Sequence, residues 1–335
     1  MAEPNLRAFR TSRSGVLFQE CVLRPGWGIL LLAILVYLLN FAAMLVFLHH
    51  GYRPHLVTAF APRDYTPQAS ALFAIFFATY LLSLMEHRTL ADYGFAGSNA
   101  LRLLATGITI GGLAITLLIA VLYGSHLLIV QRLPRSGSSF FYYAVLNGCI
   151  FFFVAYLEES LFRGYLQYSL TRGLTYLYRR VFGTRDPAKW AFWTSAALLS
   201  LAFGLTHFFN ANESRIGVAS ATLFGVVMCA ALWRTGSLWW AIGFHTAWSW
   251  MQAFLFGTSD SGMLLRDRLA TSTSLGDPQW SGGLTGPEGS LLSLLVLLLV
   301  LVVLPFPTAR NAIYPDLRIQ TVFEPAGEMR PDPDA

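Results

Sequence analysis

The stretch Cys149–Arg163, with the sequence CIFFFVAYLEESLFR, decides the fold. An unbroken apolar run leads directly into two glutamates, and an arginine follows four residues after the second. Ionisable groups at membrane depth cost at least ~2.5 kcal/mol each on insertion scales and are functional candidates. The stretch therefore indicates a membrane-spanning helix that carries a polar site.

Composition extends this interpretation to the whole chain. Of 335 residues, 55% are hydrophobic and 12% charged, whereas soluble domains carry about 25% charged residues. A helix crosses a bilayer with about 20 apolar residues. The sequence predicts an all-α, polytopic membrane helical bundle with about eight transmembrane helices. Their approximate ranges are Trp27–Leu48, Ala69–Met85, Leu101–Tyr123, Phe140–Leu166, Trp190–Phe208, Ile216–Trp233, Leu238–Phe256 and Leu291–Phe306.

The rest of the chain divides around this membrane domain, which spans residues 27–306. Residues 1–26 form a cytoplasmic N-terminal segment, because basic residues gather on the cytoplasmic side and the best distribution places both termini there. Residues 257–290 are rich in Ser, Thr and Gly and predict a flexible external loop. Residues 307–335 predict a disordered tail. Arginine strongly outnumbers lysine, which points to a GC-rich bacterial genome and hence to the bacterial inner membrane.

The charge pattern argues against a nucleic-acid-binding protein, and the cysteine spacing argues against a disulfide-rich or thiolate-metal protein. The net charge is +5, but no basic stripe is interleaved with aromatic residues, so no nucleic-acid partner is predicted. The three cysteines show no paired spacing. The sequence therefore predicts neither a disulfide framework nor a thiolate metal site.

The intramembrane polar residues are concentrated in three predicted helices. Glu159 and Arg163 are four residues apart and share a helix face, so they can pair. Glu158 lies about 100° round the helix and can face a different neighbour. One carboxylate then binds the arginine, and the other remains available for proton abstraction. The fifth helix ends at His207, and the seventh contains His245.

Each histidine has a partner four residues away, Phe203 for His207 and Ser249 for His245. An imidazole can hold a water beside a carboxylate or donate a hydrogen bond to an oxyanion. Taken singly, these residues have structural explanations: the Glu159–Arg163 pair can lock two helices together, and a histidine at a helix end can reach the interface. Their joint occurrence favours a catalytic site.

Three motifs resemble the CAAX-processing endopeptidase and bacteriocin-processing (CPBP, Abi) family of intramembrane glutamic proteases. EExxxR matches at Glu158–Arg163 and FxxxH at Phe203–His207. The third motif, HxxxN or HxxxD, begins at His245 but has Ser249 at its last position. The resemblance covers the motif core at 142–251 and makes 27–306 an intramembrane protease-like domain.

The resemblance implies a role for each motif residue. Glu158 is the general base and His207 helps to hold the water. His245 stabilises the tetrahedral intermediate with Ser249, whose hydroxyl donates one hydrogen bond over a shorter reach than Asn or Asp. The implied catalytic set is Glu158, Glu159, Arg163, His207, His245 and Ser249, with Phe203 in support.

No cofactor is expected, and zinc at Glu158, His207 and His245 stays open because these are zinc-ligand types. The implied reaction is hydrolysis of a peptide bond in a membrane-associated or C-terminally anchored substrate within the lipid. Candidates are a C-terminal sorting tail, a prenylated peptide and a bacteriocin-type peptide. Two alternatives remain: a non-catalytic immunity or assembly protein, suggested by Ser249, and a proton- or ion-coupled transporter, which the missing internal repeats disfavour.

The predicted spans create one geometric conflict. They place Glu158 in the inner half of the membrane and His207 near the outer face, since Trp190 to His207 measures ~25 Å along a helix. The two residues can meet only if the fifth helix begins well inside the cytoplasm or if the helices are tilted. A GxxxG pair at Gly107 and Gly111 in the third span does not decide the oligomeric state.

Overall fold

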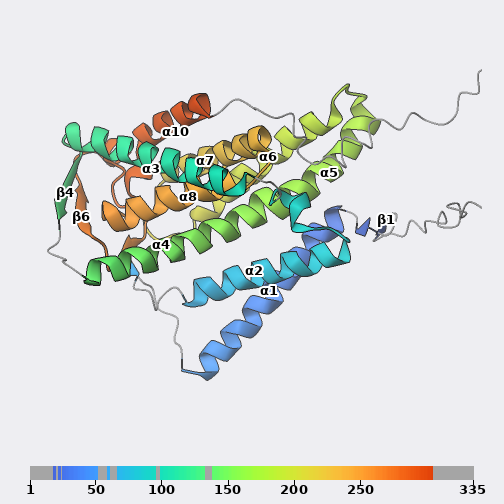
Figure 1. The fold of residues 1–335 in the computed structure, drawn as a ribbon, viewed down its shortest axis with the longest axis horizontal. Coiled ribbons are helices and arrows are strands. Elements are labelled where there is room, and N and C mark those ends of the chain that lie inside the picture. Colours follow the sequence, from blue (N-terminus) through green and yellow to red (C-terminus); the bar gives the residue numbers. More distant parts are fainter. Residues whose placement is uncertain are drawn as a thin grey trace, which may run out of the picture.

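The computed structural model of the chain describes residues 18–19, 22–23, 25–51, 59–60, 66–95, 99–132 and 138–304. Helices dominate these residues (Figure 1). Their bounds are α1 Pro25–His49, α2 Thr66–Met85, α3 Ala100–Gly124, α4 Ser138–Glu159, α5 Gln167–Leu177, α6 Pro187–His207, α7 Arg215–Thr235, α8 Trp239–Trp250, α9 Pro278–Ser281 and α10 Leu291–Val303. Short strands pair as β1 Phe18–Gln19 with β2 Val22–Leu23, β3 Ala59–Phe60 with β5 Leu264–Leu265, and β4 Leu128–Arg132 with β6 Ala270–Ser274.

Each of the predicted spans coincides with a helix, so the all-α membrane bundle is confirmed. Within the described residues, four helices are long and apolar enough to cross a membrane: Pro25–His49, Ala100–Gly124, Phe140–Phe182 and Arg215–Thr235. Ser70–Met85 and Leu291–Val303 are shorter apolar helices. The count of eight spans stays a prediction. The N-terminal segment before Pro25, apart from β1 and β2, and the tail 307–335 lie outside the described residues.

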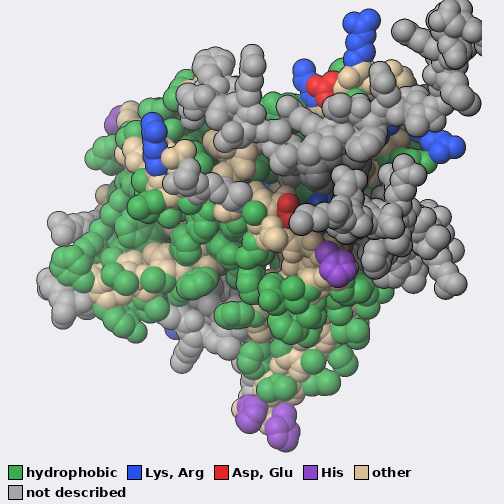
Figure 2. Space-filling model, turned by 45° about the vertical axis from the view of Figure 1, so that its right-hand side comes forward, with side chains coloured by type: hydrophobic (Ala, Val, Ile, Leu, Met, Phe, Trp, Pro, Cys, Tyr) green, Lys and Arg blue, Asp and Glu red, His purple; other side chains and the backbone are tan. Residues whose placement is uncertain are grey.

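The outer surface of the bundle is strongly apolar. Figure 2 shows hydrophobic side chains covering most of the described part of one face. Large side chains that are more than 60% exposed occur on several helices: Tyr37, Phe73, Leu101, Leu113, Phe141, Val145, Leu295 and Val302. Soluble monomers rarely expose contiguous apolar areas of this extent. The surface therefore matches that of a multi-pass membrane protein.

The fourth predicted span ends too early. The helix does not stop at Leu166 but continues from Ser138 to Phe182 through π-helical turns at Ser160–Leu166 and Tyr178–Phe182. No glycine in the left-handed region and no proline interrupts it before Gly183, whose φ is +55°. The apolar run becomes polar after Leu166, which predicts the end of the span, but polar residues do not break a helix.

This longer helix removes the predicted conflict between Glu158 and His207. After Gly183 the chain turns back at once, and α6 begins at Pro187 with Asp186 accepting a hydrogen bond from the Lys189 amide at 3.2 Å. Helices α5 and α6 form an antiparallel hairpin that projects from the bundle (Figure 1). Residues about equally far from the turn lie at the same level, which brings His207 to the level of Glu158.

Glycines let α3 and α8 pack backbone to backbone. A Cβ at Gly107 would lie 2.2 Å from the carbonyl oxygen of Trp240, and one at Gly111 would lie 2.4 Å from that of Phe244. Gly243 of α8 reciprocates, since its Cβ would lie 2.3 Å from the Leu104 oxygen. The GxxxG pair thus serves a contact within the chain, and this contact sets the position of the helix that carries His245.

Gly111→Val tests this contact. The added side chain overpacks the α3–α8 interface, so we expect a loss of about 1–3 kcal/mol in the free energy of unfolding. Gly124→Val on the same helix is the matched control, because nothing lies within 4 Å of a Cβ there. Unfolding of both variants in detergent would be followed by circular dichroism. Equal unfolding midpoints for the two variants would contradict the prediction.

A buried polar cluster outside the motifs ties α2 to α5. The Glu86 carboxylate follows α2 and accepts hydrogen bonds from the hydroxyls of Tyr93 and Tyr165, both at 3.4 Å. The Arg172 guanidinium lies 3.5 Å from the same carboxylate. Each Glu86 oxygen therefore has a partner in this cluster, which explains the burial of an ionisable group by structure alone.

Residues 257–290 are folded, and the prediction of a flexible loop is wrong. β6 pairs antiparallel with β4 along five residue pairs from Ala270 to Ser274. The segment also contains α9 and a 3₁₀ turn at Pro287–Gly289, and it buries Thr258, Ser281 and Thr285. Its polar composition suggested a free loop, but its hydroxyl groups bond to backbone carbonyls and allow it to pack on the bundle.

Candidate active site

Three helices bring the motif residues together. Glu158 and Glu159 end α4, and Arg163 lies in the following π-helical turn. Phe203 and His207 lie near the end of α6, and α8 carries His245 and Ser249. Contacts of α4 with α8 and of α6 with the π-helical turn place these segments side by side.

Glu159 is the fully buried centre of the site. Its Oε1 accepts a hydrogen bond from Arg163 Nη1 at 3.1 Å and lies 3.0 Å from His245 Nδ1. The predicted ion pair is thus present, and a single carboxylate oxygen joins two helices. Because a carboxylate only accepts, the His245 Nδ1 atom donates and its Nε2 atom faces away from Glu159.

The Phe203 ring lies between the guanidinium of Arg163 and the imidazole of His207. Its ring centre is 4.4 Å from the guanidinium carbon of Arg163, a cation–π contact. The His207 ring packs edge-on at 4.7 Å. Phe203, the first residue of the FxxxH motif, therefore separates the Glu159–Arg163 ion pair from the imidazole of His207.

Glu158 faces open space instead of the ion pair. It lines a cavity of about 370 Å³ together with His207, His245 and Ser249. Its Oε2 lies 3.9 Å from His245 Nε2, and its side chain is 29% exposed. The two adjacent carboxylates thus face different surroundings, as predicted: Glu159 is buried in an ion pair, and Glu158 lines the cavity.

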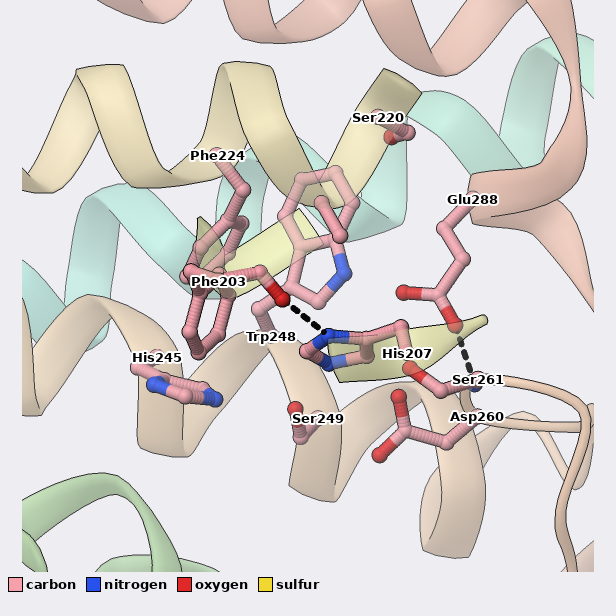
Figure 3. Close-up of a pocket in the computed structure, with 11 residues that line it drawn as sticks. Phe203, His207, Ser220, Phe224, His245, Trp248, Ser249, Asp260, Ser261 and Glu288 are labelled. Carbon is pink, nitrogen blue, oxygen red and sulfur yellow. Dashed lines mark hydrogen bonds between the residues drawn. The ribbon is translucent and has the colours of Figure 1, made fainter. Parts of the chain in front are cut away.

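The hydrogen bond of His207 fixes its tautomer. Nδ1 lies 2.8 Å from the backbone oxygen of Phe203. A carbonyl only accepts, so Nδ1 carries the hydrogen and, in the neutral ring, Nε2 is an acceptor. The close-up in Figure 3 shows this bond, with the ring between Trp248 and Asp260.

Several residues of the site were missed from the sequence. A smaller cavity on the other side of His207 is lined by Asp260, Ser261 and Glu288 of the segment 257–290 (Figure 3). The Ser261 amide donates to Glu288 Oε1. No motif or periodicity marks these residues. The available signal was that two acidic groups flank a polar segment between apolar helices.

Glu213, in the turn between α6 and α7, joins this acidic group. Burial, together with the charge of Glu288, raises its pKa from 4.5 to about 8. Burial also raises the pKa values of Glu288 and Asp260. The folded protein therefore binds these protons more tightly than the unfolded chain, and the stabilisation is lost as pH rises.

Glu213→Gln tests this pH dependence. For Glu213 the contribution is complete below pH 4.5 and lost as the pH rises through about 8. We expect the unfolding temperature of the wild type to fall across this range and that of Glu213→Gln, which is neutral throughout, to fall less. Asp186→Asn, at an exposed position, should keep the wild-type slope. Identical slopes for wild type and Glu213→Gln would refute the assignment.

The described side chains form no metal-binding site of three or more ligands. Within the part of the chain that the structure describes, no group of three or more His, Cys, Asp or Glu could hold a metal ion. The trio Glu158, His207 and His245 shares a cavity but is not such a group. Metal-free chemistry remains a prediction.

Comparison with known proteins identifies the motif core. Residues 139–251 match the family model described as type II CAAX prenyl endopeptidase, Rce1-like. This range includes all the motif residues from Glu158 to Ser249 and covers about a third of the chain. No curated protein and no solved structure matches. The resemblance seen in the motifs is confirmed for the segment 139–251, which contains the buried ion pair and both imidazoles and is similar to the CAAX prenyl endopeptidases.

Proposed function

We propose that this protein is an intramembrane endopeptidase that hydrolyses a peptide bond with a water activated by Glu158. One observation carries the proposal. Glu158 lines the same cavity as His207 and His245, while Glu159 is held by Arg163 and His245. A carboxylate that is free of the ion pair and faces two imidazoles suits a general base.

The hydrogen-bond directions suggest how the water is held. His207 Nε2 accepts one hydrogen of the water and Glu158 accepts the other. As the oxygen attacks the substrate carbonyl carbon, Glu158 takes its proton and a C–O bond forms. The Nε2 edge of His245, which faces the cavity, stabilises the oxyanion, and the Ser249 hydroxyl donates a hydrogen bond to it. The C–N bond then breaks, giving a carboxylic acid and an amine.

The cavity walls favour a membrane-associated substrate. Beyond the polar residues, the larger cavity is lined by Ala71, Leu72, Phe151 and Val154 of α2 and α4. The matched family is named for prenyl endopeptidases, so a prenylated C-terminal peptide is the first candidate. A C-terminal sorting tail and a bacteriocin-type peptide present similar apolar anchors. We place the protein in the bacterial cytoplasmic membrane with both termini inside, surrounded by lipid and without a cofactor.

Two assays test this proposal, one on peptide termini from cells and one on a defined peptide probe. Mass spectrometry of membrane and secreted peptides from cells with wild type or Glu158→Gln should reveal new termini that depend on Glu158. In parallel, the purified full chain in liposomes should cleave a fluorescent farnesylated peptide with a CAAX C-terminus. If neither assay shows cleavage and the biological role survives in Glu158→Ala with His207→Ala, the protein is a non-catalytic partner. Flux across the liposomes that depends on Glu158 would indicate a transporter.

A further inference from the structure

The two cavities of the site meet at one carboxyl group. The larger cavity contains Glu158 and the smaller one contains Glu288, and they share His207, His245, Ser249, Asp260 and Ser261. Asp260 is the carboxyl group within this shared set. Unlike the three motif residues, it comes from the segment 257–290, outside the range that matches the family. It therefore lies within reach of any molecule that occupies the catalytic cavity.

The protein holds Asp260 in a fixed position. Gln252, which is fully buried beyond α8, donates from Nε2 to the Ser259 carbonyl at 2.9 Å and to Asp260 Oδ1 at 3.4 Å. The backbone of Asp260 exchanges hydrogen bonds with that of Met263 at 2.8 and 2.9 Å. Ser261 adopts a φ of +49°, which is uncommon for a residue other than glycine. Such local strain is typical of positions that serve a site.

The surroundings of Asp260 favour its neutral form. Burial and the negative charges of Glu288 and Glu158 raise the pKa of Asp260 well above 3.8, and the nearby Ser249 hydroxyl lowers this pKa in part. The titratable groups around it are Glu158 on α4, His207 on α6, His245 on α8, Glu213 after α6, and Glu288. With Asp260 itself, four carboxyl groups lie near two imidazoles, so the site favours keeping at least one of its carboxyl groups protonated.

We propose that Asp260 is the general acid of the reaction, with Gln252 positioning its carboxyl group. This inference rests on the proposed function. Two carboxyl groups in different environments can divide the acid and base roles at one pH. When the C–N bond breaks, its electron pair goes to nitrogen, and the Asp260 O–H proton follows to give the neutral amine. Glu158 retains the proton from the attacking water, and transfer through cavity water returns it to Asp260.

The closing experiment compares two leaving groups in the full chain reconstituted in liposomes. The probes are a farnesylated peptide amide and the nitrophenyl ester of its acyl half, whose leaving group needs no proton. Asp260→Asn keeps the shape and a hydrogen-bond donor but has no acidic proton. We expect amide hydrolysis to fall at least ~100-fold while ester hydrolysis changes little. Glu158→Gln should lose both activities, because both need the activated water.

A second measurement needs no substrate. Infrared spectra at neutral pH should show the carbonyl band of a protonated carboxyl group that disappears in Asp260→Asn and persists in Asp267→Asn of the same segment. Equal loss of amide and ester hydrolysis in Asp260→Asn, or the absence of this band, would overturn the role of Asp260 and leave that of Glu158 intact. A wild type that cleaves neither probe would remove the proposed function and the acid together.

Discussion

Glu158→Gln should lower the rate of peptide cleavage by about 10²–10⁴-fold, the usual contribution of a positioned general base. Glutamine has nearly the same shape, but its amide does not take a proton from water at neutral pH. Because Glu158 lines the cavity and takes no part in the buried ion pair, the unfolding temperature should remain that of the wild type. Initial rates on the farnesylated probe and thermal unfolding in detergent measure the two effects.

The control for this prediction is Asp186→Asn. Asp186 is an exposed carboxylate at the start of α6, and asparagine also caps a helix well. Both its cleavage rate and its unfolding temperature should match the wild type. A folded Glu158→Gln protein with a wild-type cleavage rate would refute the proposed base.

Arg163→Ala should destabilise the folded protein by about 3–5 kcal/mol, as is usual when one partner of a buried ion pair is removed. Glu159 is fully buried and would lose its guanidinium partner, with His245 left as its contact from α8. The cation–π contact with Phe203 would also disappear. Reversible unfolding in mixed micelles measures the loss.

Two further variants isolate the cause of this loss. Arg102→Ala removes an arginine from an exposed position on α3 and should cost little. Arg163→Lys keeps the charge but loses the planar fork, so its stability should lie between those of wild type and Arg163→Ala. An Arg163→Ala protein as stable as Arg102→Ala would show that the pair contributes nothing to folding.

The ion pair and the division of the two glutamates were predictable because both depend on helical periodicity alone. Glu159 and Arg163 are four residues apart, so any helix places them together, and Glu158 then faces another side. A π-helical turn at Ser160–Leu166 did not disturb this relation. Apolar run length likewise located the helices that coincide with the predicted spans, since the bilayer sets that length.

Helix ends and the segment 257–290 could not be predicted in the same way. The apolar run of the fourth predicted span ends at Leu166, but nothing in the polar residues that follow ends a helix, and α4–α5 continues to Phe182. The folding of the segment 257–290 depends in part on pairing between β4 and β6, which are separated by well over a hundred residues. Pairings of this kind leave no local pattern, so the sequence predicts a loop where the structure has a folded segment of the site.

The placement of the segment 257–290 has a consequence for biosynthesis. A ribosome that has released the chain only as far as Phe256 has already delivered both glutamates, the arginine and the two imidazoles to the membrane. The hollow between them, however, still lacks the wall supplied by Asp260, Ser261 and Glu288. The proposed hydrolytic activity would therefore arise late in synthesis, and a prematurely terminated chain would lack this wall of the cavity.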